Sequence, residues 1–90
     1  MQNRYVRAKS LLEAELGDEI VALDVEGGDC FGFNSVAADI WRLLETPCDA
    51  EALQRELLNR YEVSSVECAA EIDSHLAKLE DMGLIRTVDP

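Results

Sequence analysis

The chain has 90 residues, 48% of them apolar and 30% charged, which is the composition of one globular domain with a modest core. Residues 1–9 contain three basic side chains and no acid, whereas the remaining 81 residues contain five basic and nineteen acidic side chains, a net charge of −14. We therefore expect a basic segment, 1–9, before a domain, 10–90, whose acidity repels phosphate backbones and argues against nucleic acid as a partner.

The first third of the chain predicts three strands. Residues 10–16 alternate loosely in hydrophobicity, and a turn signal at Gly17-Asp18 follows them. Residues 19–26 then place alternate apolar side chains, among them Val21, on one face of a half-buried strand. Residues 30–33 form the third strand after a turn rich in glycine. We expect the three strands to form an antiparallel meander.

The register of the second and third strands can be argued from burial. A two-residue loop would leave an apolar face on each side of the hairpin. A three-residue loop, 27–29, pairs Val25 with Phe31 and Leu23 with Phe33, and collects the large apolar side chains on one face. We therefore predict the three-residue loop.

Three helices follow the strands, each preceded by a residue suited to cap it. The first begins after Asn34-Ser35 and ends at Thr46-Pro47, the second follows Asp49, and the third follows Ser64 and is closed by Gly83. Strands followed by helices indicate an α+β domain. Three strands and three short helices resemble a winged helix-turn-helix arrangement in which the wing comes first.

Residues that could carry catalysis or bind a metal are scarce. His75 is the only histidine and follows Asp73-Ser74 on a helix, where neighbours point about 100° apart and cannot form a triad. Cys30, Cys48 and Cys68 lack ligand spacing and form no CxxC motif. We therefore expect no catalytic residue, no metal, no cofactor and a reducing cytoplasm. No apolar run is long enough to predict a membrane partner.

Two alternative functions are compatible with parts of the chain. The stretch DSHL at 73–76 is similar to the signature of acyl and peptidyl carrier proteins, but its serine lies in the middle of a helix. A winged-helix transcription regulator needs basic or amide side chains where its recognition helix begins. The third helix has acids such as Glu67 there, and no basic residue before Lys78.

The third strand lacks the lysine, proline or bulge that usually protects an exposed edge. Gly32 at its centre is typical of a place where another backbone comes close. An extended peptide could add to this edge as a further strand. Residues 1–8 or the extended piece 84–88 could cover it instead, and a second copy could pair with it to give an edge-paired homodimer in place of a monomer.

The stretch LDVEGGDCFGFNSVAADIWRLLE, residues 23–45, resembles the PqqD-like proteins. The similarity lies in a strand, a Gly/Asp turn, the aromatic-x-aromatic-Asn motif ending at Asn34, two or three small residues and the Ile-Trp-x-Leu-Leu motif that contains Trp41. Residues 53–85 continue it. This family is named for the peptide chaperone of pyrroloquinoline quinone (PQQ) biosynthesis. It includes the precursor-recognition elements of many ribosomally made, modified peptides and the stand-alone leader-binding proteins of lasso-peptide pathways.

The resemblance implies a bacterial, non-catalytic domain. It implies that a precursor's leader region adds as a strand to the third strand, beside the third helix, and is presented to a modifying enzyme or leader peptidase of a lasso-peptide or PQQ-type pathway. The helix positions are inferred as those turned toward the sheet, and Ile72 and Leu76 could equally be core. Phe33 and Trp41 are interpreted as core residues. The expected peptide-binding residues are Cys30, Phe31, Gly32, Phe33, Asn34, Ala69, Ile72, Asp73 and Leu76.

Overall fold

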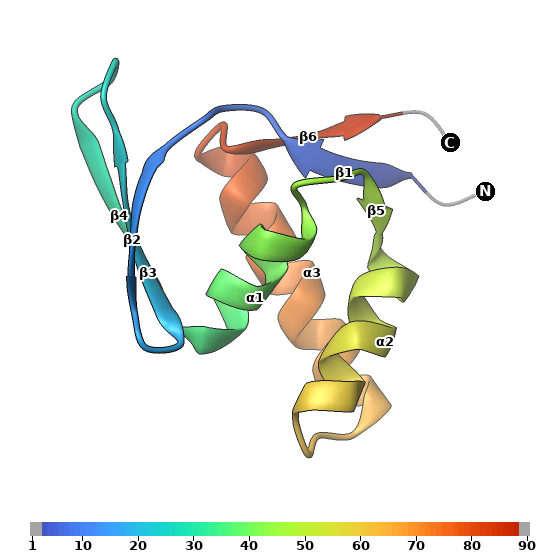
Figure 1. Ribbon diagram of the computed structural model, residues 1–90. Helices are drawn as coiled ribbons and strands as arrows, with labels where there is room; N and C mark the ends of the chain where they lie inside the picture. Colours follow the sequence, from blue (N-terminus) through green and yellow to red (C-terminus); the bar gives the residue numbers. More distant parts are fainter. Residues whose placement is uncertain (1–2, 89–90) are drawn as a thin grey trace.

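The computed structural model describes residues 3–88 and consists of two small sheets and three helices (Figure 1). The outermost parts of the expected segments 1–9 and 10–90, namely residues 1–2 and 89–90, lie outside the described residues. In chain order the elements are β1 (Arg4–Arg7), β2 (Leu12–Leu16), β3 (Glu19–Asp24), β4 (Asp29–Phe33), α1 (Ser35–Leu43), β5 (Cys48–Asp49), α2 (Ala50–Arg60), α3 (Ser65–Asp81) and β6 (Ile85–Val88).

The predicted antiparallel meander is confirmed, with β2, β3 and β4 side by side in that order. A two-residue turn, Gly17-Asp18, joins β2 to β3, and Gly17 adopts the positive φ of 65° that glycine tolerates without strain. Figure 1 shows this sheet at one end of the molecule, next to α1. Its position leaves one face toward the helices and the other toward solvent.

The predicted register of β3 and β4 is wrong. Ala22 lies opposite Phe31 and Ile20 opposite Phe33, so the four residues 25–28 connect the strands instead of three. The phenylalanines therefore share the face of β3 that packs on the helices. The opposite face of β3, which the sequence pattern predicted to be buried, is the exposed one.

The hydrogen bonds of Asp24 account for the longer loop. This buried carboxylate accepts a hydrogen bond from the Gly27 N–H at 3.3 Å and another from the Lys9 ammonium at 3.0 Å. Its backbone oxygen accepts the Gly28 N–H at 2.7 Å. The sheet consequently carries apolar side chains on both faces. A register chosen only to gather apolar side chains on one face would not give this result.

All three predicted helices form, and their predicted caps are confirmed. The side chains of Asn34, Asp49 and Ser64 each accept the backbone N–H three residues further on, at 2.9, 2.8 and 3.1 Å. Gly83 follows α3 with φ at 72°, and the Leu84 N–H returns to a carbonyl in the last turn at 3.0 Å. This pair of features is the Schellman ending of a helix.

A second sheet has the order β5-β1-β6. β1, which belongs to the basic segment, pairs antiparallel with β6 along its whole length, from Arg4 opposite Val88 to Arg7 opposite Ile85. The basic segment is therefore built into the fold, and the predicted extended piece 84–88 contains β6. Figure 1 shows this sheet across the helices from the β2-β3-β4 sheet.

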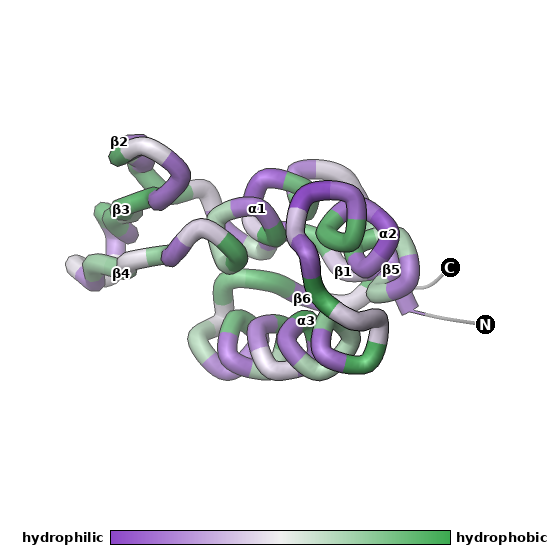
Figure 2. Tube along the Cα trace, turned by 90° about the horizontal axis from the view of Figure 1, so that it is seen from below, coloured by the Kyte–Doolittle hydropathy of each residue, from purple (hydrophilic) through white to green (hydrophobic). Residues whose placement is uncertain are grey.

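The core lies between the helices and the inner face of the β2-β3-β4 sheet. The predicted core positions of Trp41 and Phe33 are confirmed by their burial. Figure 2 shows hydrophobic and hydrophilic stretches alternating along the helices. Within residues 3–88, no helix is long and apolar enough to cross a membrane. The largest fully buried side chains are Trp41, Ile20, Ile40, Leu44, Leu53, Ile72 and Leu84.

Candidate functional site

One edge of β4 has no strand partner among residues 3–88. β3 occupies its other edge, and the chain segments that could have covered it, 1–8 and 84–88, contribute β1 and β6, which pair with each other. The alternative that the described part of the chain's own tails covers this strand is therefore wrong. The edge presents backbone N–H and C=O groups that an extended peptide could pair with.

Small side chains occupy the outer face of β4. Cys30 is exposed, and a Cβ placed on Gly32 would meet nothing within 4 Å. Gly32 lies in a continuous register with β3, so it marks no bulge. The glycine is therefore not demanded by the packing of this chain, and it leaves room beside the free edge.

A cleft separates β4 from the C-terminal half of α3. The phenylalanines of β4 and Ala37 of α1 are part of its lining. Because the unpaired edge of β4 borders this cleft, an added strand would have side-chain contacts available on α3 as well as backbone groups on β4. The lining residues are Cys30, Phe31, Gly32, Phe33, Asn34, Ala37, His75, Lys78, Leu79 and Met82.

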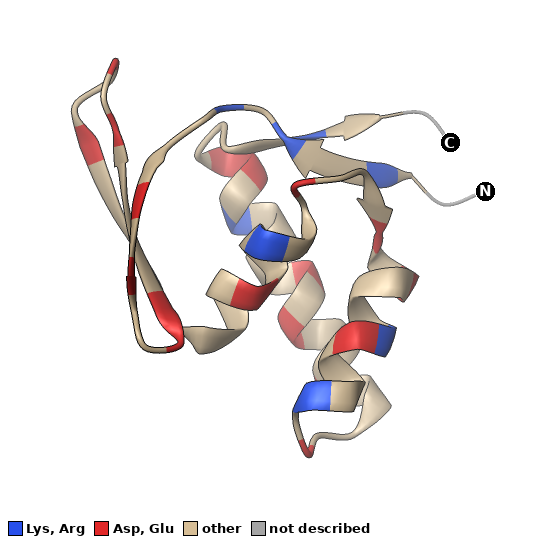
Figure 3. Cartoon of the chain, viewed as in Figure 1, with Lys and Arg blue, Asp and Glu red and all other residues tan. Residues whose placement is uncertain are grey.

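The cleft lining carries no acidic side chain, although acids lie on β2, β3 and all three helices (Figure 3). It includes Lys78 and His75. His75 is half-buried, and this burial lowers the pKa of its imidazole below the ordinary value of 6.5, although Glu71, 3.5 Å away, opposes the shift. His75 is therefore neutral at pH 7, and Lys78 supplies the positive charge of the cleft.

Two of the cleft residues stabilise the fold. The side chain of Asn34 is engaged in capping α1 through Ala37, so its amide oxygen is already occupied. Phe33 stacks on Trp41 with ring centroids 5.5 Å apart, which ties β4 to α1. These contacts hold the strand in place but give it no chemistry of its own.

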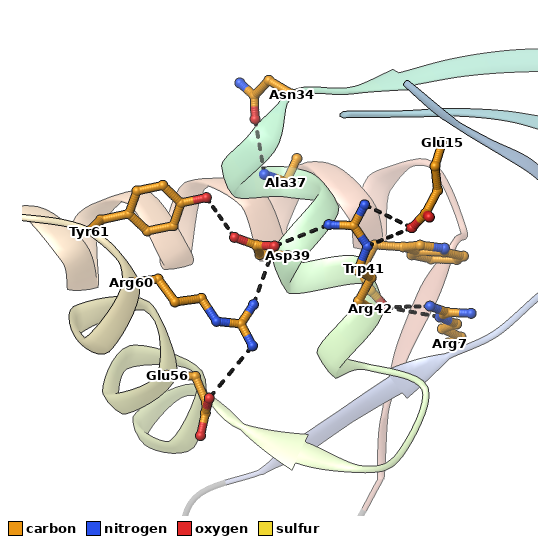
Figure 4. Close-up of polar contacts among 10 residues, drawn as sticks. All are labelled: Arg7, Glu15, Asn34, Ala37, Asp39, Trp41, Arg42, Glu56, Arg60 and Tyr61. Atoms are coloured by element: carbon orange, nitrogen blue, oxygen red, sulfur yellow. Dashed lines mark hydrogen bonds and ion pairs between the residues drawn. The ribbon is translucent and has the colours of Figure 1, made fainter. Parts of the chain in front are cut away.

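Trp41 is itself fixed from the opposite side. Its indole N–H donates to Glu13 of β2 at 2.9 Å, and the Arg7 guanidinium lies 4.4 Å from the ring centroid. Arg7 also donates to the Trp41 backbone oxygen at 2.7 and 3.0 Å (Figure 4). Strand β2, helix α1 and the basic segment are thus held together by these contacts.

A second polar cluster joins α1 to α2. Asp39 accepts a hydrogen bond from the Tyr61 hydroxyl at 2.6 Å and forms ion pairs with Arg42 at 3.1 Å and Arg60 at 3.3 Å (Figure 4). The hydrogen bond to Asp39 raises the pKa of the Tyr61 hydroxyl. All of these groups are satisfied by one another, which is the arrangement of a structural network and not of a reactive centre.

The expected helix residues do not line the cleft. Ala69, Ile72 and Asp73 border a different hollow, between α3 and α2, and Leu76 is buried in the core. The expectation that they are turned toward the sheet is wrong for Ala69 and Asp73, because the N-terminal half of α3 packs on α2. Ile72 is a core residue like Leu76, which is the alternative that the sequence left open. A part for them in peptide binding stays a prediction.

Four cleft residues on α3 were missed by reasoning from the sequence. Each lies three or four residues from two of the others, so they form one stripe that runs from the last turns of α3 to its C-cap residue, Met82. Leu79 and the exposed Met82 gave an apolar signal that could have revealed the stripe. The stripe consists of His75, Lys78, Leu79 and Met82.

No group of three or more potential ligands among residues 3–88 is placed to hold a metal ion. The family described as "Coenzyme PQQ synthesis protein D (PqqD)" matches residues 19–85, about three quarters of the chain. The chain belongs to the PqqD family.

A solved structure gives a second comparison for this PqqD family member. The chain is similar to TbiB1, solved in complex with the TbiA(beta) leader peptide, with 25% sequence identity and a TM-score of 0.78. The match covers 90% of this chain and 94% of TbiB1. It confirms the α+β fold and the resemblance read from the motifs. A search of curated protein sequences gave no match.

Proposed function

We propose that this protein binds the leader region of a ribosomally synthesised precursor peptide. The leader adds as an antiparallel or parallel strand to the free edge of β4 and packs its side chains into the cleft beside α3. The protein acts without catalysis of its own and presents the precursor to a modifying enzyme or leader peptidase. The unpaired edge of β4, bordering a cleft, carries this proposal.

Three further observations support it. Membership of the PqqD family and the similarity to TbiB1, which was solved with a leader peptide, agree with peptide binding. The cleft offers apolar contact at Leu79 and Met82, which suits the side chains of a bound strand. The cleft lining contains no carboxylate that could neutralise the ammonium group of Lys78. Lys78 therefore favours an acidic or neutral leader residue beside it.

Hydrogen exchange tests the strand addition directly. Alternate residues of an edge strand point their N–H groups outward, so only one of two sets in β4 can pair with a leader. Using a synthetic leader from a neighbouring short reading frame, we expect slower exchange either at Cys30 and Gly32 or at Phe31 and the residues that alternate with it. Protection confined to the hollow between α2 and α3 would contradict the proposal.

A pair of variants on α3 tests the cleft. Met82 lines it and is 43% exposed, whereas Val66 is 79% exposed at the other end of the same helix and lies outside it. Burying the exposed part of Met82 is worth about 1 kcal/mol, so Met82→Ser should weaken leader binding about fivefold. Val66→Ser should leave the affinity unchanged. Fluorescence anisotropy with a labelled leader measures both.

A regulator would behave differently in the same assays. Saturable leader binding with no retention of DNA at physiological salt is the result expected here. Failure of every leader encoded nearby to bind, together with sequence-specific retention of DNA, would refute peptide recognition in favour of transcription regulation. Acids such as Glu67 in the first turn of α3 are unfavourable for that second outcome.

A further inference from the structure

A second hollow adjoins the cleft between β4 and α3. The cleft includes Ala37 of α1 and His75 of α3, whereas the hollow includes Val36, one residue earlier in α1, and Glu71, one turn earlier in α3. The side chains of Glu71 and His75 lie 3.5 Å apart at this border. The hollow has a volume of about 420 Å³. We call it the α1 hollow; its apolar lining consists of Val36, Leu57, Tyr61, Val63, Cys68 and Ala70.

The walls of the α1 hollow are held in place by the fold. Leu57 and Cys68 are buried in the core, and the Tyr61 ring is fixed by the hydrogen bond from its hydroxyl to Asp39 at 2.6 Å. Val63, in the loop between α2 and α3, is 42% exposed and offers apolar surface at the opening. The hollow is therefore formed before any ligand arrives, which lowers the entropic cost of binding.

The two remaining residues of the lining are acidic. Glu67 and Glu71 are both exposed, and among the described residues no lysine or arginine lines the α1 hollow. The imidazole of His75 beside Glu71 supplies no charge at pH 7, because burial lowers its pKa. The hollow is therefore apolar with a negatively charged side. A ligand that suits it combines an apolar surface with a positive charge.

The charges along α3 have a definite order. Glu67, Glu71, His75 and Lys78 follow one another at intervals of four, four and three residues, which places them on one face of the helix. The glutamates line the α1 hollow, and Lys78, the only lysine or arginine of α3 (Ser65–Asp81), lines the cleft (Figure 3). A leader that lies along this face matches it with a basic residue beside the glutamates and an acidic or neutral residue beside the lysine.

A lysine or arginine side chain of the leader meets these requirements. Each has an aliphatic stem that packs on apolar surface and a charged group that stays in water. A second copy of the chain is a poorer occupant, because its basic segment is built into its own fold, where β1 pairs with β6 and Arg7 donates to Trp41. A nucleic acid is a poorer occupant as well, because the two glutamates repel phosphates.

We propose that the α1 hollow binds a lysine or arginine side chain of the leader, outside the segment that pairs with β4. This inference rests on the proposed leader binding. Successive turns of α3 are about 5.4 Å apart and an extended residue spans about 3.3 Å, so the basic residue lies about two to four residues beyond the last paired one. The hollow adjoins the end of β4 that leads into α1. An antiparallel leader therefore carries this residue before the paired segment, and a parallel leader carries it after.

Two double variants test this inference by fluorescence anisotropy with the labelled synthetic leader. Glu67→Gln with Glu71→Gln removes both carboxylates of the hollow, and glutamine is as suitable as glutamate three residues after the Ser64 cap. We expect about fivefold weaker leader binding, the effect of losing two exposed ion pairs. Glu80→Gln with Asp81→Asn, exposed on the same helix and outside both linings, changes the net charge equally and should leave the affinity unchanged.

Substitutions in the leader complete the test. When each lysine and arginine of the leader is replaced by glutamine in turn, one replacement should weaken binding to the wild type about fivefold and cause little further loss in Glu67→Gln/Glu71→Gln. Equal weakening by both double variants, weakening by neither, or tight binding of a leader without a basic residue within about four residues of its paired segment overturns the inference, while leader recognition stands. If the wild type binds no leader, the proposed function fails and this inference fails with it.

Discussion

Removing the Glu13 carboxylate should expose how strongly the sheet is tied to the helices. In the variant Glu13→Ala the indole N–H of the fully buried Trp41 loses its acceptor at 2.9 Å, and Arg7 loses an ion pair at 3.5 Å. An unsatisfied buried donor costs about 1–3 kcal/mol. The Glu13 side chain is 27% exposed, so water can partly replace its carboxylate as the acceptor of the indole N–H. We therefore expect Glu13→Ala to lower the free energy of unfolding by about 1 kcal/mol, the lower end of that range.

Thermal unfolding followed by circular dichroism measures this cost. A loss of 1 kcal/mol corresponds to a fall in Tm of about 4–8 °C in a domain of this size. Glu15→Ala is the matched control in the same strand, because the Glu15 side chain is 67% exposed and its ion pair with Arg42 is worth about 0–1 kcal/mol. In a Trp41→Phe background, which has no indole N–H, Glu13→Ala should cost less. Equal costs for Glu13→Ala and Glu15→Ala, or no difference in that background, would refute the reasoning.

Three further outcomes follow from local contacts. The hydrogen bond from Lys9 holds the pKa of Asp24 below its ordinary value of 3.8. The ionised Asp24 carboxylate therefore stabilises the fold fully above pH 3.8, and this stabilisation is lost as the pH falls through the lowered pKa. Asp24→Asn should consequently show a smaller fall of Tm in acid than the wild type does. Asn34→Ala should cost about 1 kcal/mol in urea unfolding by uncapping α1, while Asn34→Asp should retain most of it. Gly83→Ala, at positive φ, should cost about 1 kcal/mol, whereas Gly32→Ala, in open space, should not destabilise the protein.

The helices could be predicted from the sequence because their signals are local. Asn34, Asp49 and Ser64 each act on an N–H only three residues away, and Gly83 acts within the turn that it closes. The order of patterns, strands before helices, was likewise sufficient for the fold class. These features need no knowledge of what packs against them.

The register could not be predicted because it depends on distant partners. Glu13 and Glu15 point inward on account of Trp41 and Arg42, which are 28 and 27 residues further along the chain. Nothing in the alternation of residues 10–26 shows that acids would be preferred on the inner face. Maximal apolar burial within one hairpin therefore predicts the wrong face of β3 as the buried one.

The structure has a cleft beside β4, where the sequence predicts one, but it lies along a different part of α3 from the predicted part, and its use by a peptide stays a prediction. The apolar stripe through Ile72 and Leu76 was visible in the sequence, but it is the core side of the helix. Ala69 lies where α3 meets α2, and only the last turns, near Met82, approach β4. A helix of 17 residues can face two different neighbours along its length, and periodicity alone does not say where the change occurs.

The observed register also decides what β4 offers to a bound leader. Because Phe31 and Phe33 pair with the inner residues of β3, the outer positions of β4 are Cys30 and Gly32. These two positions carry small side chains, so they leave the free edge of the strand open to a second backbone. On the proposed function the leader is therefore recognised largely through the backbone of β4, and the inward aromatic side chains hold that backbone in place against α1.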